Sequence, residues 1–144
     1  MSVTRISAAL RRLIEDRAQG RCEYCLLPSG VAFFPHEIDH VIAEKHGGAT
    51  DAANLAFTCW RCNRHKGSDL GSFDPVTGAF SMLFNPRAQQ WSDHFALREG
   101  LLVGLTPEGR TTALLLQLNL HERVSERRRL ETLGQYAAPG HGVS

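Results

Sequence analysis

The stretch that decides the fold runs from residue 22 to residue 67 and reads CEYCLLPSGVAFFPHEIDHVIAEKHGGATDAANLAFTCWRCNRHKG. It begins with one Cys-x-x-Cys pair, Cys22 and Cys25, and ends on a second, Cys59 and Cys62, and these are all the cysteines of the chain. A tight turn within each pair directs both sulfurs at one ion, so two pairs form the closed tetrahedral shell of structural zinc. We therefore predict a four-cysteine zinc site that holds the fold together and leaves no position open for a substrate.

Other uses of the four thiols fit the sequence less well. Redox dithiols usually occur singly beside a βαβ pattern, which is absent here. No apolar run approaches the ~20 residues of a membrane span, and the charged N-terminal residues lack the apolar core of a signal peptide. We therefore expect a cytoplasmic protein with no membrane partner, where disulfides are rare. Iron in place of zinc stays open, because cysteine spacing does not distinguish the two metals.

Length and charge set further bounds. A chain of 144 residues is long enough for one compact domain and too short for two ordinary ones, so we predict a single domain over 1–144. The formal net charge of +1 does not by itself indicate a nucleic-acid partner. The basic residues are mostly arginine and occur in clusters, which suits phosphate contact but is equally typical of solvated helix faces.

Hydrophobic patterning predicts an α+β fold in three parts. The core spans about 20–70, with a β-hairpin over 31–42 that turns near Pro35 and a short helix that ends near Gly67. A helix over about 4–18 precedes the core. A hairpin-plus-helix extension over about 71–135 follows, with hairpins inside 73–86 and 97–110 and helices over 111–118 and 121–133. The last helix has a candidate buried stripe: Leu120, Val124, Leu130 and Leu133.

Residues between and beside the cysteine pairs could form a hydrolytic site. Phosphodiester cleavage needs a deprotonated water, a cation on the phosphoryl oxygens and groups that hold both in line. His40 can act as a base near neutral pH, and Asp39 offers the oxygen ligand that Mg²⁺ or Mn²⁺ prefers. Asn63 follows Cys62 directly, so the zinc knuckle would orient its amide. An Asp-His pair alone is more often a surface feature, and on a regular strand the two side chains face opposite sides.

The order and spacing of these residues match a known family. The run C-x2-C, E-x-D-H-x5-H-G-G, N-L-x3-C-x2-C-N-x2-K-G resembles the HNH endonucleases, the ββα-metal or His-Me finger group, over residues 22–67. The resemblance implies a small ββα-metal core and one-metal hydrolysis of DNA. It implies that His40 is the general base, that Asp39 is a ligand of the catalytic ion, and that Asn54 tethers the loop of the base.

The last histidine of the family name is replaced by Asn63, which makes this chain an HNN variant. Asparagine remains an oxygen ligand, so the replacement favours Mg²⁺ or Mn²⁺ over ions that prefer imidazole. Glu37 and His46 are lesser candidates, for support of the metal ligands and for capping a loop. The candidate contacts to the DNA backbone lie on the short helix, namely Arg61, Arg64, His65 and Lys66.

The resemblance thus predicts a zinc-containing, Mg²⁺- or Mn²⁺-dependent endonuclease with DNA as partner, and a homodimer if both strands are cut together. The rival hypothesis is a non-catalytic zinc module that binds nucleic acid or protein. That module would keep the cysteines without needing Asp39, His40, Asn54 and Asn63 together. A second rival is a zinc-stabilised protein-interaction domain, with segment 83–95 as its docking surface and three aromatic anchors that are more simply read as core: Phe84, Trp91 and Phe95.

Overall fold

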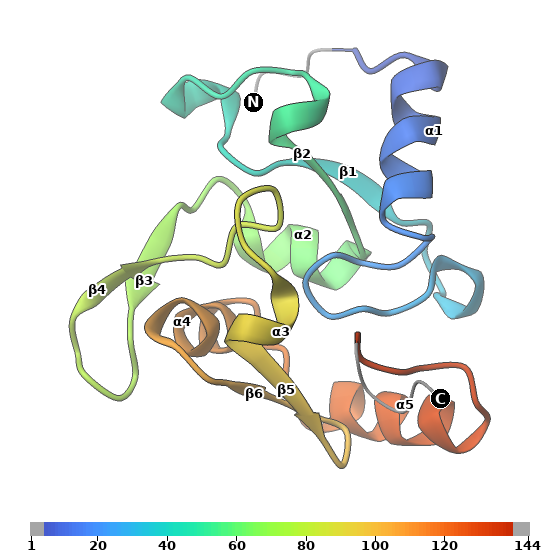
Figure 1. Ribbon diagram of the computed structural model, residues 1–144, viewed down its shortest axis with the longest axis vertical. Helices are drawn as coiled ribbons and strands as arrows, with labels where there is room; N and C mark the ends of the chain where they lie inside the picture. Colours follow the sequence, from blue (N-terminus) through green and yellow to red (C-terminus); the bar gives the residue numbers. More distant parts are fainter. Residues whose placement is uncertain (1–4, 140–144) are drawn as a thin grey trace.

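The computed structural model describes residues 5–139 and has the α+β fold that the sequence predicts (Figure 1). Its strands form three separate two-stranded antiparallel sheets within the described residues. The elements are, in chain order, α1 (Ala8–Arg17), β1 (Glu37–His40), β2 (Leu55–Thr58), α2 (Trp60–Lys66), β3 (Gly71–Phe73), β4 (Phe80–Met82), α3 (Trp91–His94), β5 (Phe95–Arg98), β6 (Leu101–Gly104), α4 (Pro107–Leu115) and α5 (His121–Thr132). Over residues 5–139, no helix is both long and apolar enough to cross a membrane.

The ββα unit at the centre consists of β1, β2 and α2. Strand β1 pairs with β2, with Glu37 opposite Thr58 and His40 opposite Leu55. The predicted hairpin over 31–42 is therefore wrong: the partner of β1 comes from the far side of a long loop, 41–54. Proline has no amide hydrogen for a ladder, and around Pro35 the chain runs as an irregular segment with exposed side chains. Helix α2 ends before Gly67, as predicted.

Helix α1 begins later than the predicted residue 4, which lies outside the described residues. Ser7 is the N-cap, and its hydroxyl accepts a hydrogen bond from the amide of Leu10 at 3.1 Å. Such a cap satisfies an amide that the first helical turn leaves without a partner. Ile14 faces the ββα unit and packs with Leu55 and Phe57 into a small apolar cluster.

The C-terminal extension contains the two predicted hairpins, β3–β4 and β5–β6. The helix predicted over 111–118 instead begins at Pro107, because Thr106 caps it by accepting from the amide of Gly109 at 3.0 Å. Segment 83–95 connects the hairpins, and its aromatic anchors Phe84, Trp91 and Phe95 are buried. The three aromatic residues are therefore core residues, the simpler of the two readings, and are not exposed as anchors for a partner.

The main hydrophobic core joins the extension to the cysteine pairs. It holds all four cysteines together with buried residues of the extension: Leu83, Phe84, Trp91, Phe95, Leu97, Leu102, Leu116, Leu118, Leu130, Tyr136 and Ala138. The indole NH of Trp91 donates to the carbonyl of Tyr24 at 2.8 Å, and the Tyr136 hydroxyl donates to the carbonyl of Cys25 at 2.7 Å. The first cysteine pair is thus packed and hydrogen-bonded by residues more than sixty positions away.

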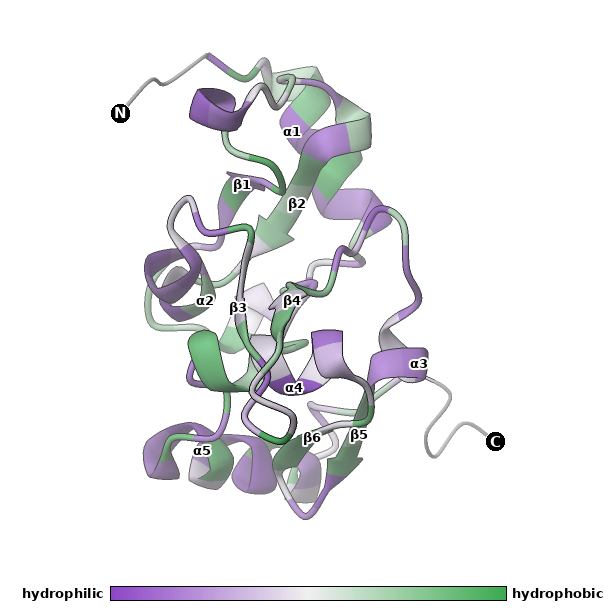
Figure 2. Cartoon of the chain, turned by 90° about the vertical axis from the view of Figure 1, so that its left-hand side faces the viewer, coloured by the Kyte–Doolittle hydropathy of each residue, from purple (hydrophilic) through white to green (hydrophobic). Residues whose placement is uncertain are grey.

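Helix α5 packs into the molecule through arginines and not through the leucine stripe that the sequence predicts. Of the four predicted residues only Leu130 is buried, whereas Leu120 and Leu133 are exposed. Arg123 and Arg127 occupy the inner face instead, and each is 2% exposed. The helix is therefore largely hydrophilic in sequence (Figure 2), although one side of it belongs to the interior.

Candidate metal centre and active site

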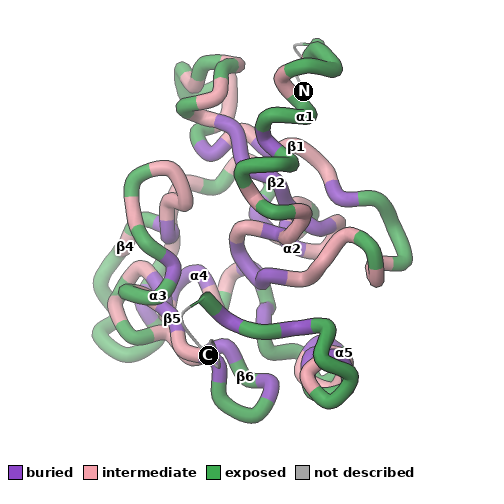
Figure 3. Tube along the Cα trace, turned by 45° about the vertical axis from the view of Figure 1, so that its right-hand side comes forward, coloured by how far each residue is buried: buried purple, intermediate pink, exposed green. Residues whose placement is uncertain are grey.

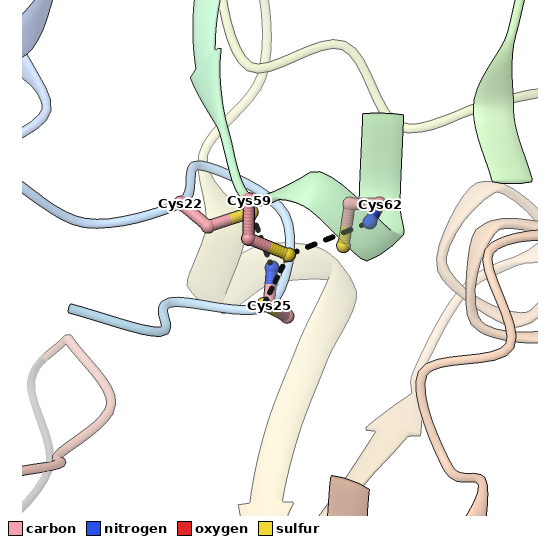
Figure 4. A group of neighbouring side chains, drawn as sticks. All are labelled: Cys22, Cys25, Cys59 and Cys62. Atoms are coloured by element: carbon pink, nitrogen blue, oxygen red, sulfur yellow. Dashed lines mark hydrogen bonds between the residues drawn. The ribbon is translucent and has the colours of Figure 1, made fainter. Parts of the chain in front are cut away.

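The four cysteine sulfurs converge between the loop at Cys22–Cys25 and the start of α2 (Figure 4). All four sulfurs lie within 4.8 Å of one another, and Cys25 Sγ lies 3.6 Å from Cys59 Sγ. In each pair the amide of the second cysteine donates to the sulfur of the first, at 3.5 Å for Cys25 and 3.4 Å for Cys62. These bonds bend each pair into a knuckle and turn both of its sulfurs towards the centre.

The donor set fits a structural zinc ion. A tetrahedron with Zn–S bonds of about 2.3 Å has sulfurs roughly 3.8 Å apart, close to the separation found here. Burial raises the pKa of the Cys22 and Cys62 thiols, because the interior disfavours a thiolate without a counter-charge. A divalent cation supplies that counter-charge and displaces the protons. The four-cysteine site thus suits zinc, as the sequence predicts.

Arg123 brings a second positive charge to the cysteines. Its guanidinium donates to Cys62 Sγ at 3.1 Å and lies 3.9 Å from Cys59 Sγ. It also donates to two backbone carbonyls, of Leu116 at 2.9 Å and of Gln117 at 3.2 Å. Burial alone would lower the pKa of Arg123, but the neighbouring thiolates outweigh it and raise that pKa. Helix α5 therefore belongs to the metal centre.

The end of β1 carries the predicted Asp39 and His40, whose side chains contact different elements. Asp39 Oδ2 lies 2.9 Å from the ammonium of Lys66 on α2. Burial raises the pKa of Asp39, and the ion pair with Lys66 opposes this shift without cancelling it. Lys66 also donates to the backbone carbonyl of His40 at 3.0 Å. One buried ammonium therefore joins the Asp39 carboxylate to the backbone of His40.

Asn63 lies one turn before Lys66 on the same face of α2, and its side-chain amide donates to Glu37 Oε1. Glu37 and Asp39 share one face of β1 by the alternation of a strand, and each meets one residue of α2. Because the nitrogen of the Asn63 amide is used by Glu37, its oxygen remains the group for a cation. Glu37, Asp39 and Asn63 thus supply three oxygen-bearing side chains where β1 meets α2, a donor set that suits Mg²⁺ or Mn²⁺.

His40 points to loop 41–54 instead. Its Nε2 lies 2.8 Å from the hydroxyl of Thr50, and that hydroxyl donates to Glu44 Oε2 at 3.1 Å. A hydroxyl has one proton to donate. Since that proton is directed at Glu44, Nε2 of His40 is the donor to Thr50, and Nδ1 is the ring nitrogen with a free lone pair.

Loop 41–54 is fastened by Asn54. Its carbonyl oxygen accepts from the amide of Ile42, and its amide nitrogen donates to the carbonyls of Ile42 and Ala49, each at 2.9 Å. The loop closes tightly around this side chain, because a Cβ at Gly48 would lie 2.7 Å from the Asn54 amide nitrogen. The geometry agrees with the tether that the resemblance implies.

The four predicted DNA contacts on α2 separate into two groups. The side chain of Lys66 is 2% exposed and ion-paired with Asp39, so the structure does not present its ammonium to a DNA backbone. Arg61, Arg64 and His65 lie on the outer part of the helix. Burial and the charges of Arg123 and Arg61 lower the pKa of His65, so it is mainly neutral at pH 7.

Sequence reasoning missed Thr50, Glu44, Lys66 as a structural cation, and Arg123. The K of the C-N-x2-K-G run marked Lys66 as important without indicating that it points inward. Thr50 and Glu44 are common polar residues in a loop and carry no spacing signal. Arg123 lies 61 positions after Cys62 in an ordinary Arg-rich helix, and only packing brings it to the sulfurs.

Comparison with known proteins identifies the central part of the chain. No curated protein and no solved structure matches it. Residues 22–69 match the sequence profile of the HNH endonuclease family, and they contain both cysteine pairs, β1, β2 and α2. The ββα unit and the four clustered cysteines lie within this match, so residues 22–69, one third of the chain, have the features of an HNH endonuclease domain.

Proposed function

We propose that this protein is a metal-dependent endonuclease that hydrolyses phosphodiester bonds in DNA, with His40 as the general base. The observation that carries the proposal is the hydrogen-bond chain from His40 through Thr50 to Glu44. It fixes the imidazole in the tautomer whose Nδ1 can take a proton from water. A surface histidine with no catalytic role needs no such chain.

The proposed base is held from three sides. Thr50 orients the ring, Lys66 holds the backbone carbonyl of His40, and Asn54 closes the loop that carries Thr50. A general base must stay within hydrogen-bond reach of the proton that it removes. The three contacts come from separate elements, so together they limit both rotation of the ring and movement of the strand end.

The residues that would hold a catalytic cation are Asp39 and Asn63, with Glu37 beside Asn63. Bound Mg²⁺ or Mn²⁺ would stabilise the negative charge on the phosphate oxygens during the attack of water. Lys66 already pairs with Asp39, so it keeps a positive charge at this carboxylate and orients it. The zinc knuckle fixes the start of α2, which in turn sets the position of Asn63.

The test is cleavage of supercoiled plasmid by zinc-loaded protein with added Mg²⁺ or Mn²⁺. His40→Ala is expected to abolish cutting while retaining one zinc per chain. The matched control is His46→Ala, since His46 is an exposed histidine of loop 41–54, which directly follows His40, and it should cut like the wild type. Nicking before linearisation is the expected order for a protein that cuts one strand at a time, and concentration-dependent linearisation would indicate a homodimer.

Two results would contradict the proposal. Cutting by His40→Ala at the wild-type rate would show that His40 is not the base. Absence of cutting on plasmid, single-stranded and branched DNA, with zinc bound, would favour the rival hypothesis of a non-catalytic module that binds nucleic acid or protein.

A further inference from the structure

Two adjacent phenylalanines lie on the outside of the segment that leads into β1. Phe33 is 92% exposed and Phe34 is 45% exposed, and the segment lies on the outside of the molecule (Figure 3). Truncating Phe33 would remove almost no buried area, so packing does not explain a large aromatic residue at this position.

These rings are the outer part of an ordered aromatic stack. Phe33 packs edge-on against Phe34 at 4.8 Å between ring centres, and Phe34 lies over Trp60 at 4.9 Å with 33° between the planes. The guanidinium of Arg64 lies 4.7 Å from the centre of the Trp60 ring. We call Phe33, Phe34 and Trp60 the aromatic platform. It borders a groove of about 190 Å³, whose other lining residues are Leu27, Ala32, Cys59, Arg61 and Glu126.

Positive charge accompanies the platform. Arg64 lies against Trp60, and Arg61 lines the groove next to it. Arg61 forms an ion pair with Glu126 at 3.5 Å, in which both side chains are partly exposed. Such a pair contributes little to stability, so Arg61 can exchange Glu126 for a phosphate. Aromatic faces beside arginines are the combination that binds single-stranded nucleic acid.

The platform is joined directly to the proposed active site. Trp60 begins α2, which carries Asn63 one turn later, and Phe34 lies just before β1, which ends at His40. Six residues separate Phe34 from His40, which sets an upper limit of about 20 Å at ~3.3 Å per residue. A base on the platform would therefore lie at most about six base steps of ~3.4 Å from His40.

We propose that the aromatic platform stacks an unpaired base of the DNA substrate, a few nucleotides from the scissile bond. This inference rests on the proposed nuclease function and specifies its substrate class: DNA with a single-stranded segment beside the cut. A base inside a duplex has both faces covered by its neighbours and offers none to Phe33. Arg61 and Arg64 contact the phosphates that flank the stacked base.

The experiment measures binding on a background that does not cut. His40→Ala protein with zinc bound is titrated, in Mg²⁺, against a labelled 12-nucleotide single strand and a duplex of the same sequence. Phe33→Ala is added to this background. Its matched control is Phe73→Ala, because Phe73 is also strongly exposed, at 63%, but lies on β3 away from the platform. A 2-aminopurine base at successive positions of the strand reports stacking by loss of its fluorescence.

Stacking on one aromatic ring is expected to contribute at least about fivefold in affinity. Phe33→Ala should therefore bind the single strand about fivefold more weakly or worse, with duplex affinity unchanged, and Phe33→Trp should restore binding. Phe73→Ala should bind like its parent. Fluorescence of 2-aminopurine should fall at one register only, and Phe33→Ala should abolish that fall.

Failure of the inference and failure of the proposed function give different results. Unchanged single-strand binding by Phe33→Ala, in a protein whose wild type cuts DNA, would overturn the platform and leave the nuclease intact. If Phe33→Ala instead abolished self-association in sedimentation without affecting DNA binding, the patch would be an interface between two copies and the inference would be wrong. Platform-dependent binding by a wild type that cuts no DNA would support the platform and overturn the nuclease.

Discussion

Replacement of Arg123 by methionine tests whether α5 is part of the metal centre. Methionine keeps the bulk of the arginine stem and removes the guanidinium. The change takes away the hydrogen bonds to Cys62 Sγ and to the carbonyls of Leu116 and Gln117. Among the residues that the structure describes, Arg123 is the one arginine that donates to the cysteine sulfurs. A zinc ion with four thiolates carries two net negative charges, and the substitution would remove the positive charge nearest to it, the Arg123 guanidinium.

The expected loss follows from the burial of this arginine. Removing one partner of a buried charge pair typically costs about 3–5 kcal/mol, because the other charge stays behind unpaired. For proteins of about 150 residues, a loss of 1 kcal/mol in the free energy of unfolding lowers the melting temperature by about 2–4 °C. We therefore expect Arg123→Met to melt roughly 6–20 °C below the wild type. Zinc should also be released faster to a competing chelator.

The assay combines thermal unfolding of zinc-loaded protein with the rate of zinc transfer to a colorimetric chelator. Arg129→Met is the control, because Arg129 is an exposed arginine of the same helix. Arg123→Lys keeps the charge, but a single ammonium cannot reach the sulfur and both carbonyls as a guanidinium does. Its melting temperature and its rate of zinc release should therefore lie between those of Arg123→Met and Arg129→Met. If Arg123→Met melted with Arg129→Met and released zinc at the same rate, the role assigned to Arg123 would be refuted.

Three further predictions concern the strand end, the loop and the extension. Asn54→Ala removes three hydrogen bonds of the loop, worth about 1 kcal/mol each. We therefore expect faster amide exchange over 41–50 and slower plasmid cutting, with zinc retained. Unchanged amide exchange would contradict the role of Asn54 as a tether. Lys66→Met leaves the buried Asp39 carboxylate unpaired, at a cost of about 3–5 kcal/mol at pH 7. Because burial raises the pKa of Asp39, its protonation should shrink this loss as pH falls, in thermal melts from pH 7 to pH 4; a loss that does not vary with pH would argue against the ion pair. Asp74 accepts two hydrogen bonds from Arg110, which lower the pKa of that carboxyl. Its contribution is therefore full above the usual aspartate pKa of about 4 and lost at lower pH, so Asp74→Asn should lower the melting temperature at pH 7 and converge with the wild type in acid.

Much of the central unit could be predicted from local spacing. Two residues between cysteines suffice to predict the knuckles, because the geometry of a tight turn is local. Gly67 indicated where α2 ends, and the Val-Thr-Gly turn indicated the β3–β4 hairpin for the same reason. Because both knuckles are predicted to bind the same ion, the sequence also predicts that the four cysteines lie together.

Strand pairing and the inner face of α5 could not be predicted in this way. Residues 31–36 have strand-like composition, yet β1 pairs with residues 55–58 across a fourteen-residue loop closed by Asn54. Helix α5 showed scattered leucines, and its buried positions proved to be Arg123 and Arg127. An arginine can be buried only where acceptors are already placed. Those acceptors come from other parts of the chain.

For this protein the sequence by itself determined the chemistry that is available: four thiolates at knuckle spacing, a histidine after an aspartate, and two asparagines at HNH positions. Only the tertiary structure decided which groups meet. It placed Lys66 inside against Asp39, Thr50 and Glu44 behind His40, and Arg123 on the sulfurs. The physical reason is that covalent spacing controls contacts within a turn or a helix. Contacts between distant residues depend instead on how apolar faces pack and on which buried charges must find a partner.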